Sequence, residues 1–322
     1  MLRYRGSHGG ATGDAVTALV LCGGGGRGAV EVGLYRAVVE LAVPIGLIVG
    51  TSVGAINGAA IAAGVPPDAL ARLWKSLRRQ DLFALNRQLF WRLIWADSLY
   101  DHRPLRRFLE RVLPVRTFED LRIPLIGTGT DFQTGQPVYW REGNLLDAIM
   151  ASVAMPGLFP PQVVGGVQVV DGGITDNVPI DVAVAEGADT VIFMLCACCE
   201  RTNRPVRGLL PVLRRALSIA IDRKYHADIE RHAGQAHLIA IEPPIDREID
   251  LLDFSHTVEL IEEGYASATA AFKERAMHDK SQDGNEDQLP EERKAPVAPA
   301  EALRRLRTPN LFASAANTRW ER

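Results

Sequence analysis

The stretch GTSVGAINGAAIAAG, residues 50–64, frames a serine with two glycines directly behind an apolar run. GLIV, at residues 46–49, leads into it, and an alanine-rich segment follows. The pattern predicts a buried strand, a tight turn and a helix that ends at Gly64, before two prolines. Ser52 is therefore expected at the corner between the strand and the helix.

The frame Gly-x-Ser-x-Gly around Ser52 is that of a nucleophile elbow. The sharp turn strains the serine, so the residues two places before and after it must be small, and Gly50 and Gly54 meet that need. The dipole of the following helix favours negative charge that develops on the hydroxyl. A helix N-cap serine in a glycine-bearing turn fits the same short frame, so the frame alone leaves both interpretations open.

A second strand-turn-helix unit lies upstream, in VTALVLCGGGGRGAVEVGLYRAVVEL at residues 16–41. Two such units in succession predict parallel strands joined by helical crossovers. The loop of this unit matches the dinucleotide fingerprint G-x-G-x-x-G, but the next strand does not end in the acid that would bind a ribose. The loop residues are Gly23, Gly24, Gly25, Gly26, Arg27 and Gly28.

A glycine loop beside a nucleophile has another use. The backbone N–H groups of Gly24, Gly25 and Gly26 could hold the oxyanion of an acyl-transfer intermediate, and Arg27 would add positive charge.

The base that would take the serine proton is harder to find. Most hydrolases with this elbow use a histidine, but none of the seven histidines stands in a glycine-framed or loop-end context. Asp171, in VQVVDGGITDNVP, follows an expected strand, and Gly172 and Gly173 behind it let another backbone approach closely. A carboxylate there could accept the proton directly, although a simple tight turn also fits Asp-Gly-Gly.

An aspartate with an ordinary pKa of about 4 is a weak base for an alcohol, so this chemistry requires a largely dry site. MPGLFPP, at residues 155–161, could supply apolar walls for an acyl chain through Pro156, Leu158, Phe159 and Pro160. A proline-bounded loop packed on the core fits the same residues.

The glycine loop, the serine elbow and the Asp-Gly-Gly turn, in this order, resemble the patatin-like phospholipase family over roughly residues 17–195. The resemblance implies a three-layer α/β/α fold with a mainly parallel central sheet. It also implies a Ser-Asp dyad without histidine, with Ser52 as nucleophile, Asp171 as base and Gly24, Gly25 and Gly26 as oxyanion loop. No metal or organic cofactor is implied. Cys22 stands where many bacterial members have serine.

The bulk properties suit a single large globular domain with appendages: 322 residues and a formal net charge of −3. No global basic field points to nucleic acid. The N-terminal apolar run is short and lacks a cleavage site, so no signal peptide is expected. Cys196, Cys198 and Cys199 are expected as reduced thiols of a cytoplasmic protein, since a metal site would need further ligands that the sequence does not place nearby.

The chain divides by composition. Residues 1–14 are expected to be flexible, and residues 15–277 to form the patatin-like hydrolase domain. Residues 278–300, polar and charged with several prolines, predict a disordered linker, and residues 301–322 form a basic tail.

An aromatic and basic stretch, residues 81–100, allows two interpretations. Leu89, Phe90, Leu93 and Ile94 fall on one helical face, with Trp91 and Trp95 at its edge. This is the composition of an interfacial membrane helix and also of an ordinary cap over a core.

The sequence therefore predicts a serine acyl hydrolase that cleaves carboxylic esters of phospholipids or other acyl lipids, with peripheral membrane contact as an open option. Two alternatives remain: a soluble esterase or thioesterase on small acyl substrates, and a non-catalytic protein that binds lipid in the same pocket.

Overall fold

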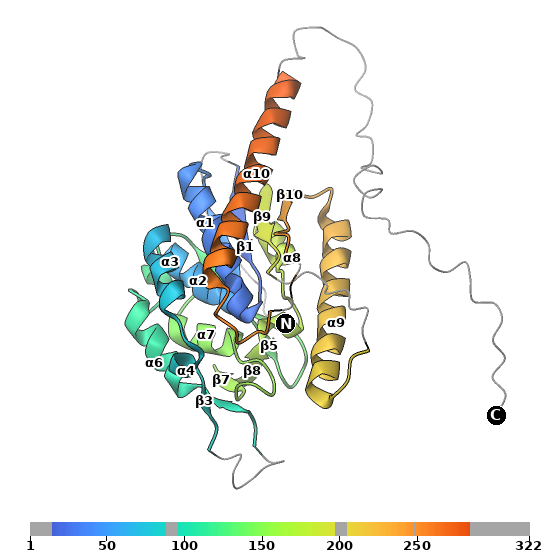
Figure 1. The fold of residues 1–322 in the computed structure, drawn as a ribbon. Coiled ribbons are helices and arrows are strands. Elements are labelled where there is room, and N and C mark those ends of the chain that lie inside the picture. The colour runs from blue at the N-terminus through green and yellow to red at the C-terminus, as the bar shows by residue number, and fades with distance from the viewer. Residues whose placement is uncertain (1–14, 88–95, 197–204, 246, 248, 284–322) are drawn as a thin grey trace, which may run out of the picture. The chain divides into compact units, whose positions relative to one another are not determined.

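The computed structural model describes residues 15–87, 96–196, 205–245, 247 and 249–283 (Figure 1). The chain divides into two compact units, Met1–Ala276 and Met277–Arg322. The last helix, α10 (Thr257–Asp283), continues past residue 278, where the sequence predicts a linker to begin. The rest of that linker, the basic tail and the predicted flexible N-terminus lie outside the described residues.

A mixed sheet in the order β10-β9-β1-β2-β5-β8-β7 forms the centre of the first unit, and β6 also pairs with β5. Its strands are β1 (Thr17–Leu21), β2 (Leu47–Gly50), β5 (Leu125–Asp131), β6 (Pro137–Trp140), β7 (Gln162–Val164), β8 (Val167–Asp171), β9 (Thr190–Met194) and β10 (His237–Ile241). The five strands from β10 to β5 are parallel, whereas β6, β8 and β7 are antiparallel to their neighbours. A short separate sheet pairs β3 (Ala84–Leu85) with β4 (Tyr100–Asp101).

The two strand-turn-helix units predicted from the sequence are confirmed. β1 and β2 pair in parallel with Leu21 opposite Gly50, and both strands are apolar along nearly their whole length because both faces of the sheet are covered. Two antiparallel hairpins belong to the same sheet, β5 with β6 and β7 with β8. Gly165 and Gly166 turn the second hairpin with positive φ angles, which suits glycine.

The described helices are η1 (Gly25–Gly28), α1 (Ala29–Glu40), α2 (Val53–Ala62), α3 (Pro67–Ser76), α4 (Arg79–Leu82), α6 (Arg103–Val112), η3 (Phe118–Asp120), α7 (Leu145–Ser152), η4 (Gly172–Ile174), α8 (Ile180–Ala185), α9 (Leu209–His232) and α10. The crossover from β1 to β2 moves along the sheet in one direction and that from β9 to β10 in the other, so right-handed crossovers put α1 and α9 on opposite faces.

Helix contacts agree with this division: α1 packs on α2 and α3, α2 packs on α7, and α8 packs on α9. Figure 1 shows α9 on the other side of the molecule from α3 and α6. The predicted three-layer α/β/α fold with a mainly parallel sheet is therefore confirmed. No helix in the described part of the chain is long and apolar enough to cross a membrane.

The order of the strands also positions the site. The direction of winding reverses between β1 and β9, and such a switch point leaves a crevice beyond the carboxyl ends of parallel strands. The glycine loop follows β1 and Ser52 follows β2, so both lie at this edge of the sheet.

Candidate active site

Ser52 occupies a strained corner between β2 and α2. Its φ of 54° and ψ of −122° lie in a region that residues other than glycine rarely adopt. A Cβ atom at Gly54 would lie 2.2 Å from the backbone oxygen of Leu21, and one at Gly50 would lie 2.6 Å from the backbone oxygen of Gly54. Both glycines of the elbow are therefore required by close backbone packing, as the sequence predicts.

The Ser52 hydroxyl faces a carboxylate. Its Oγ donates a hydrogen bond to Asp171 Oδ2 at 2.6 Å, and the serine makes no side-chain capping bond to α2. The N-cap interpretation of the serine frame therefore does not describe this side chain. The Ser52 amide donates to the hydroxyl oxygen of Ser152 at 2.8 Å, which helps to hold the corner in place.

Asp171 is positioned by the end of β8 and the turn behind it. Strand pairing sets it opposite Gly129 of β5. Its second oxygen, Oδ1, accepts from the amide of Gly173 at 2.8 Å. A Cβ atom at Gly172 would lie 2.3 Å from the hydroxyl of Thr128, so the turn can approach β5 only with glycine there. Asp-Gly-Gly is thus a tight turn whose carboxylate points at the serine.

Burial changes the acid strength of this carboxyl group. Asp171 is 1 % exposed. Burial raises its pKa from 3.8 to about 6, against the opposing effect of the hydrogen bonds from Ser52 and Gly173. At neutral pH the group is ionised, yet it is a stronger base than an aspartate in water. The dry site that the sequence argument requires is present around Asp171.

Two of the three central glycines of the loop lie beside Ser52. Gly24 and Gly25 line the cavity beside Ser52, and neither amide donates to another residue in the described part of the chain. Gly26 differs: its amide donates to the backbone oxygen of Leu251 at 2.7 Å, and it does not line the cavity. The expectation that Gly26 contributes an oxyanion donor therefore disagrees with the geometry, because its N–H group is already used.

Ser52 lies on the wall of an apolar cavity of about 220 Å³. Helices α3 and α6 contribute Leu70, Trp74 and Phe108 to its wall. Helix α9 contributes Ile221 and Tyr225. No described histidine lines this cavity.

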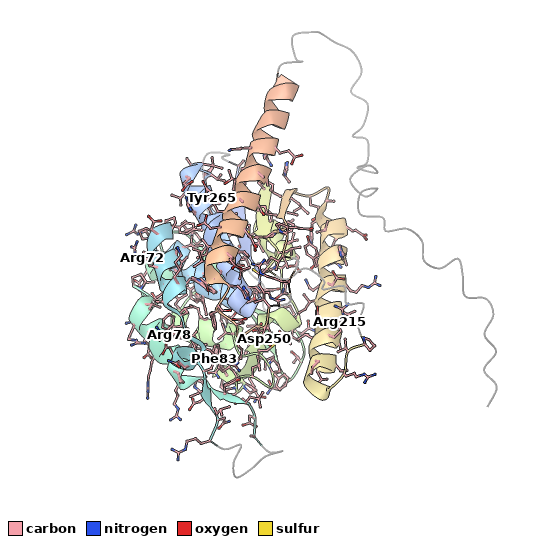
Figure 2. The ribbon with its side chains drawn as sticks, in the orientation of Figure 1. Arg72, Arg78, Phe83, Arg215, Asp250 and Tyr265 are labelled. Atoms are coloured by element: carbon pink, nitrogen blue, oxygen red, sulfur yellow. The ribbon has the colours of Figure 1, made fainter. Side chains whose placement is uncertain are left out.

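Two of the four residues expected as apolar walls, Leu158 and Phe159, line the cavity, whereas Pro156 and Pro160 do not. Phe83, labelled in Figure 2, stacks on Phe159 with ring centroids 5.4 Å apart and on Phe254 at 6.2 Å. Aromatic rings from three separate segments thus close one side of the cavity.

A segment with no recognisable motif shapes the glycine loop. A Cβ atom at Gly25 would lie 2.2 Å from the backbone oxygen of Leu251, and one at Gly26 would lie 2.2 Å from that of Asp253. Sequence reasoning missed these contacts because they are made by backbone atoms, for which the identities of Leu251 and Asp253 provide no signal.

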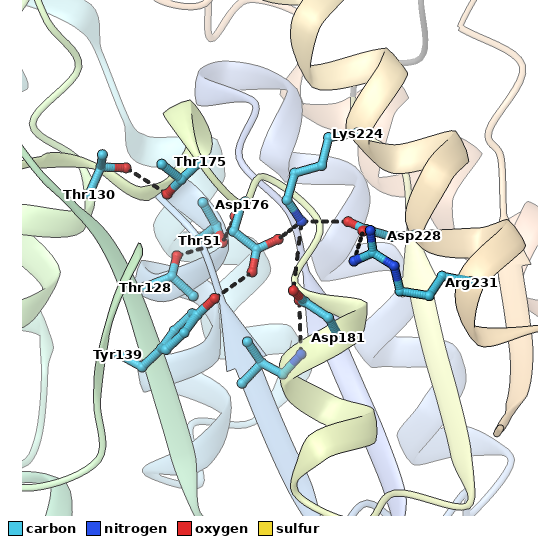
Figure 3. Close-up of polar contacts among 11 residues, drawn as sticks. Thr51, Thr128, Thr130, Tyr139, Thr175, Asp176, Asp181, Lys224, Asp228 and Arg231 are labelled. Carbon is cyan, nitrogen blue, oxygen red and sulfur yellow. Dashed lines mark hydrogen bonds and ion pairs between the residues drawn. The ribbon is translucent and has the colours of Figure 1, made fainter. Parts of the chain in front are cut away.

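A buried ionic network connects α9 to the active-site turn (Figure 3). Lys224 Nζ donates to Asp176 Oδ1 at 2.8 Å and also to Asp228. Asp176 is 1 % exposed, and its backbone oxygen accepts from the hydroxyl of Thr51, the neighbour of Ser52, at 2.9 Å. Burial and Asp181 raise the pKa of Asp176 to about 7, while Lys224 opposes that rise. The network therefore ties α9, which lines the cavity, to the backbone beside Ser52.

The structure corrects the expectation that Cys196 has no further ligand groups nearby. Cys22, Glu31 and Cys196 are buried with their ligand atoms within 4.8 Å of one another. Cys196 Sγ donates to Glu31 Oε1 at 3.2 Å, and Asn57 donates to Oε2 at 2.8 Å. Burial raises the pKa of Glu31 to about 8. The hydrogen bonds from Cys196 and Asn57 satisfy this buried carboxyl group without an ion. Cys22 and Cys196 form no disulfide within the described residues; Cys198 and Cys199 lie outside the described residues.

The predicted interfacial or capping helix also falls largely outside the described residues. Residues 88–95 are not described, and these include Leu89, Phe90, Trp91, Leu93, Ile94 and Trp95. Both interpretations of that stretch stay predictions.

The sequence profile of the family described as "Patatin-like phospholipase" matches residues 19–184, which is more than half of the 322 residues. The chain belongs to the patatin-like phospholipase family. This family is one of lipid acyl hydrolases. The matched residues include the glycine loop, the Ser52 elbow and the Asp-Gly-Gly turn, whereas α9 and the segment around Leu251 lie beyond them.

Two curated relatives carry the same family name, and a third is described as an NTE family protein. Patatin-like phospholipase domain-containing protein 7 of Rattus norvegicus is 28 % identical over 81 % of this chain and 21 % of its own length. Patatin-like phospholipase domain-containing protein 6 of Mus musculus is 31 % identical over 61 % of this chain and 14 % of its own length. An uncharacterized NTE family protein of Mycobacterium tuberculosis is 29 % identical over 79 % of this chain and 46 % of its own length. The chain thus spans less than half the length of each of these relatives.

Among solved structures, VipD from Legionella pneumophila matches 81 % of this chain and 67 % of its own, with a TM-score of 0.46 and 13 % identity. The type III effector protein ExoU matches 81 % of this chain and 53 % of its own, with a TM-score of 0.45 and 14 % identity.

Proposed function

We propose that this patatin-like protein hydrolyses carboxylic ester bonds of phospholipids or other acyl lipids through a dyad of Ser52 and Asp171. The observation that carries the proposal is the 2.6 Å hydrogen bond from Ser52 Oγ to a buried carboxylate, made from a strained elbow on the wall of an apolar cavity. Nucleophile and base lie within the reach that proton transfer needs.

In the first half of the reaction, Asp171 takes the proton of Ser52 as Oγ attacks the ester carbonyl carbon. Negative charge collects on the carbonyl oxygen, where the amides of Gly24 and Gly25 can donate to it. The intermediate then collapses, the bond to the alcohol breaks, and Asp171 returns the proton to the leaving oxygen. The acyl group stays on Ser52.

In the second half, water enters and Asp171 takes one of its protons as the water oxygen attacks the acyl carbon. The same two amides hold the second oxyanion, and collapse releases the fatty acid and restores the Ser52 hydroxyl. No step calls for a metal or an organic cofactor, which agrees with the family resemblance.

The cavity supports a lipid rather than a small acyl substrate. Its walls from α3, α6 and α9 are apolar, and an acyl chain that fills them gains about 0.8 kcal/mol for each buried methylene group. A non-catalytic lipid-binding role is less well supported, because binding alone would not need a strained serine or a buried carboxylate aimed at its hydroxyl.

Product analysis tests the proposal. We expect the purified chain to release free fatty acid from vesicles of mixed phospholipids, and its kcat/KM on nitrophenyl esters to rise with acyl length as the chain fills the cavity. Mass spectrometry of the lipid products and release of nitrophenol measure the two effects. Rates that peak at the acetyl ester, with no lipid turnover, would favour the soluble esterase instead.

Activity should fall in acid with the protonation of Asp171. The base works only when ionised, and burial raises its pKa to about 6, so the acid limb should lie near pH 6 instead of near pH 4. Below that pH, kcat/KM on a soluble ester should drop about tenfold for each pH unit. Far-ultraviolet circular dichroism at each pH shows whether the fold persists. Full activity at pH 4.5 in folded protein would contradict Asp171 as the base.

A further inference from the structure

Helix α9 carries apolar side chains both toward the cavity and on its exposed surface. On one side Leu217, Ile221 and Tyr225 recur every four residues and line the cavity with Ser52. Leu213, four residues before Leu217, continues that row toward the N-terminus but is exposed, and Val212, Ala216 and Ile219 are exposed on the opposite side. We call the exposed apolar surface of the N-terminal half of α9 its outer face; its residues are Val212, Leu213, Ala216, Ile219 and Ala220.

The outer face leaves large aliphatic side chains in water. Val212 is 47 % exposed, Leu213 is 57 % exposed and Ile219 is 46 % exposed. A helix that is apolar all round is normally buried, and a contiguous exposed apolar patch marks a surface that binds something. The outer face is therefore expected to have an apolar partner when the protein works.

Basic residues border the same half of the helix. Arg207 precedes α9, Arg215 lies within it (Figure 2), and exposed Arg223 ends the outer face. Aliphatic side chains bordered by arginines are the composition of a helix that lies in the interface of an anionic membrane.

The cavity on the inner side of α9 also favours a lipid bilayer as the partner of the outer face. A lipid substrate must move from a bilayer to Ser52, and its acyl chain is poorly solvated in water. A helix that contacts the bilayer with one side and the cavity with the other would bring the membrane to the wall of the active site. A protein partner could cover the outer face but would not account for this arrangement.

We propose that the outer face of α9 is the surface by which the protein docks on an anionic lipid bilayer. The choice of a bilayer rests on the proposed function, since the lipid nature of the substrate favours it over a protein partner. In this arrangement Val212, Leu213 and Ile219 insert among the acyl chains, and the bordering arginines contact anionic head groups.

Vesicle flotation with the full chain tests the proposal. The Ser52→Ala background keeps the vesicles intact, so binding is measured apart from hydrolysis. The probe is a vesicle of phosphatidylcholine and phosphatidylglycerol in equal parts. In this background Val212→Ser with Leu213→Ser should lower the partition coefficient about tenfold or more, because two inserted aliphatic side chains are lost. A matched pair at the C-terminal end of α1, Val39→Ser with Leu41→Ser, is similarly exposed at 50 % and 42 % and should bind within about twofold of the parent.

Further variants separate membrane insertion from a change of fold. Val212→Ile with Leu213→Met keeps the outer face apolar and should bind vesicles like the parent. The Val212→Ser, Leu213→Ser variant, called the serine pair, should cleave a soluble short ester at the parental rate when Ser52 is restored. Equal vesicle binding by the serine pair and the parent would overturn the proposal. A second result would also overturn it: light scattering without lipid that shows a dimer of the parent and a monomer of the Val212→Ser, Leu213→Ser variant. In that case a second copy of the chain would cover the outer face. A protein that binds vesicles through α9 but cleaves no ester would refute the proposed function and leave this docking surface standing.

Discussion

Alanine in place of Ser52 should lower the rate of ester hydrolysis by a factor of about 10⁴ or more while the protein stays folded. The substitution removes the attacking oxygen and leaves the cavity and the amides of Gly24 and Gly25 in place. Alanine keeps the Cβ atom, so the strained corner between β2 and α2 gains no new clash. Initial rates on a nitrophenyl ester, together with thermal melting, measure both effects.

A control separates loss of the nucleophile from loss of any serine. Ser76, exposed at the end of α3, donates to the backbone oxygen of Leu73, and Ser76→Ala should keep full activity. A fluorophosphonate probe should label the parent at Ser52 and leave the Ser52→Ala variant unlabelled. Turnover by Ser52→Ala within tenfold of the parent, with unchanged melting, would remove Ser52 from the mechanism.

Asparagine in place of Asp171 should cost nearly as much activity as loss of Ser52. Its amide keeps the size of the carboxyl group, and its oxygen can still accept from the Gly173 amide, whose present bond to Oδ1 is 2.8 Å long. The NH₂ group would then face Ser52 and donate to Oγ, so that the hydroxyl has no base to take its proton. The kcat of this variant on a soluble ester should fall by about 10²–10⁴ or more.

The double variant tests whether the two residues act as a unit. If Asp171 serves Ser52 directly, Ser52→Ala with Asp171→Asn should be no less active than Ser52→Ala alone. Glutamine in place of each of the seven histidines, one at a time, should leave activity within about tenfold of the parent. A histidine variant as inactive as Ser52→Ala, beside a mild Asp171→Asn, would show that a histidine is the base.

Local sequence was enough to predict the elements that carry the site. The strand, turn and helix around Ser52 follow from an apolar run, a glycine-framed serine and an alanine-rich segment within about fifteen residues. Glycine is needed at Gly50 and Gly54 because the backbones of β1 and α2 pass too close for a Cβ atom. This requirement is visible in the sequence as the two glycines that frame Ser52. Gly165 and Gly166 suit their turn for a different local reason, their positive φ angles, since nothing lies within 4 Å of a Cβ atom at either position.

The partners of these local elements were not predictable in the same way. Ser52 and Asp171 are 119 residues apart, and their hydrogen bond depends on how β8 pairs with β5 across the sheet. Nothing near Asp171 in sequence states its burial, which raises its pKa to about 6 and makes it a useful base. The residues alone left Asp171 open as either a base or part of a simple tight turn, and the family resemblance favoured the base.

Beyond the region of resemblance, the tertiary structure decided everything that bears on the site. The Gly26 amide donates to the backbone oxygen of Leu251. Every residue type has a backbone oxygen, so no sequence pattern could predict this hydrogen bond. In sequence, Lys224 and the outer face of α9 look like ordinary residues of a long helix. They bear on the site only because α9 packs on the far face of the sheet and lines the cavity from there. Sequence alone determined which short segments form strands, turns and helices, because neighbouring residues encode them. Packing between distant segments decided which atoms can react, because hydrogen bonds, burial and pKa depend on contacts that the order of residues does not list.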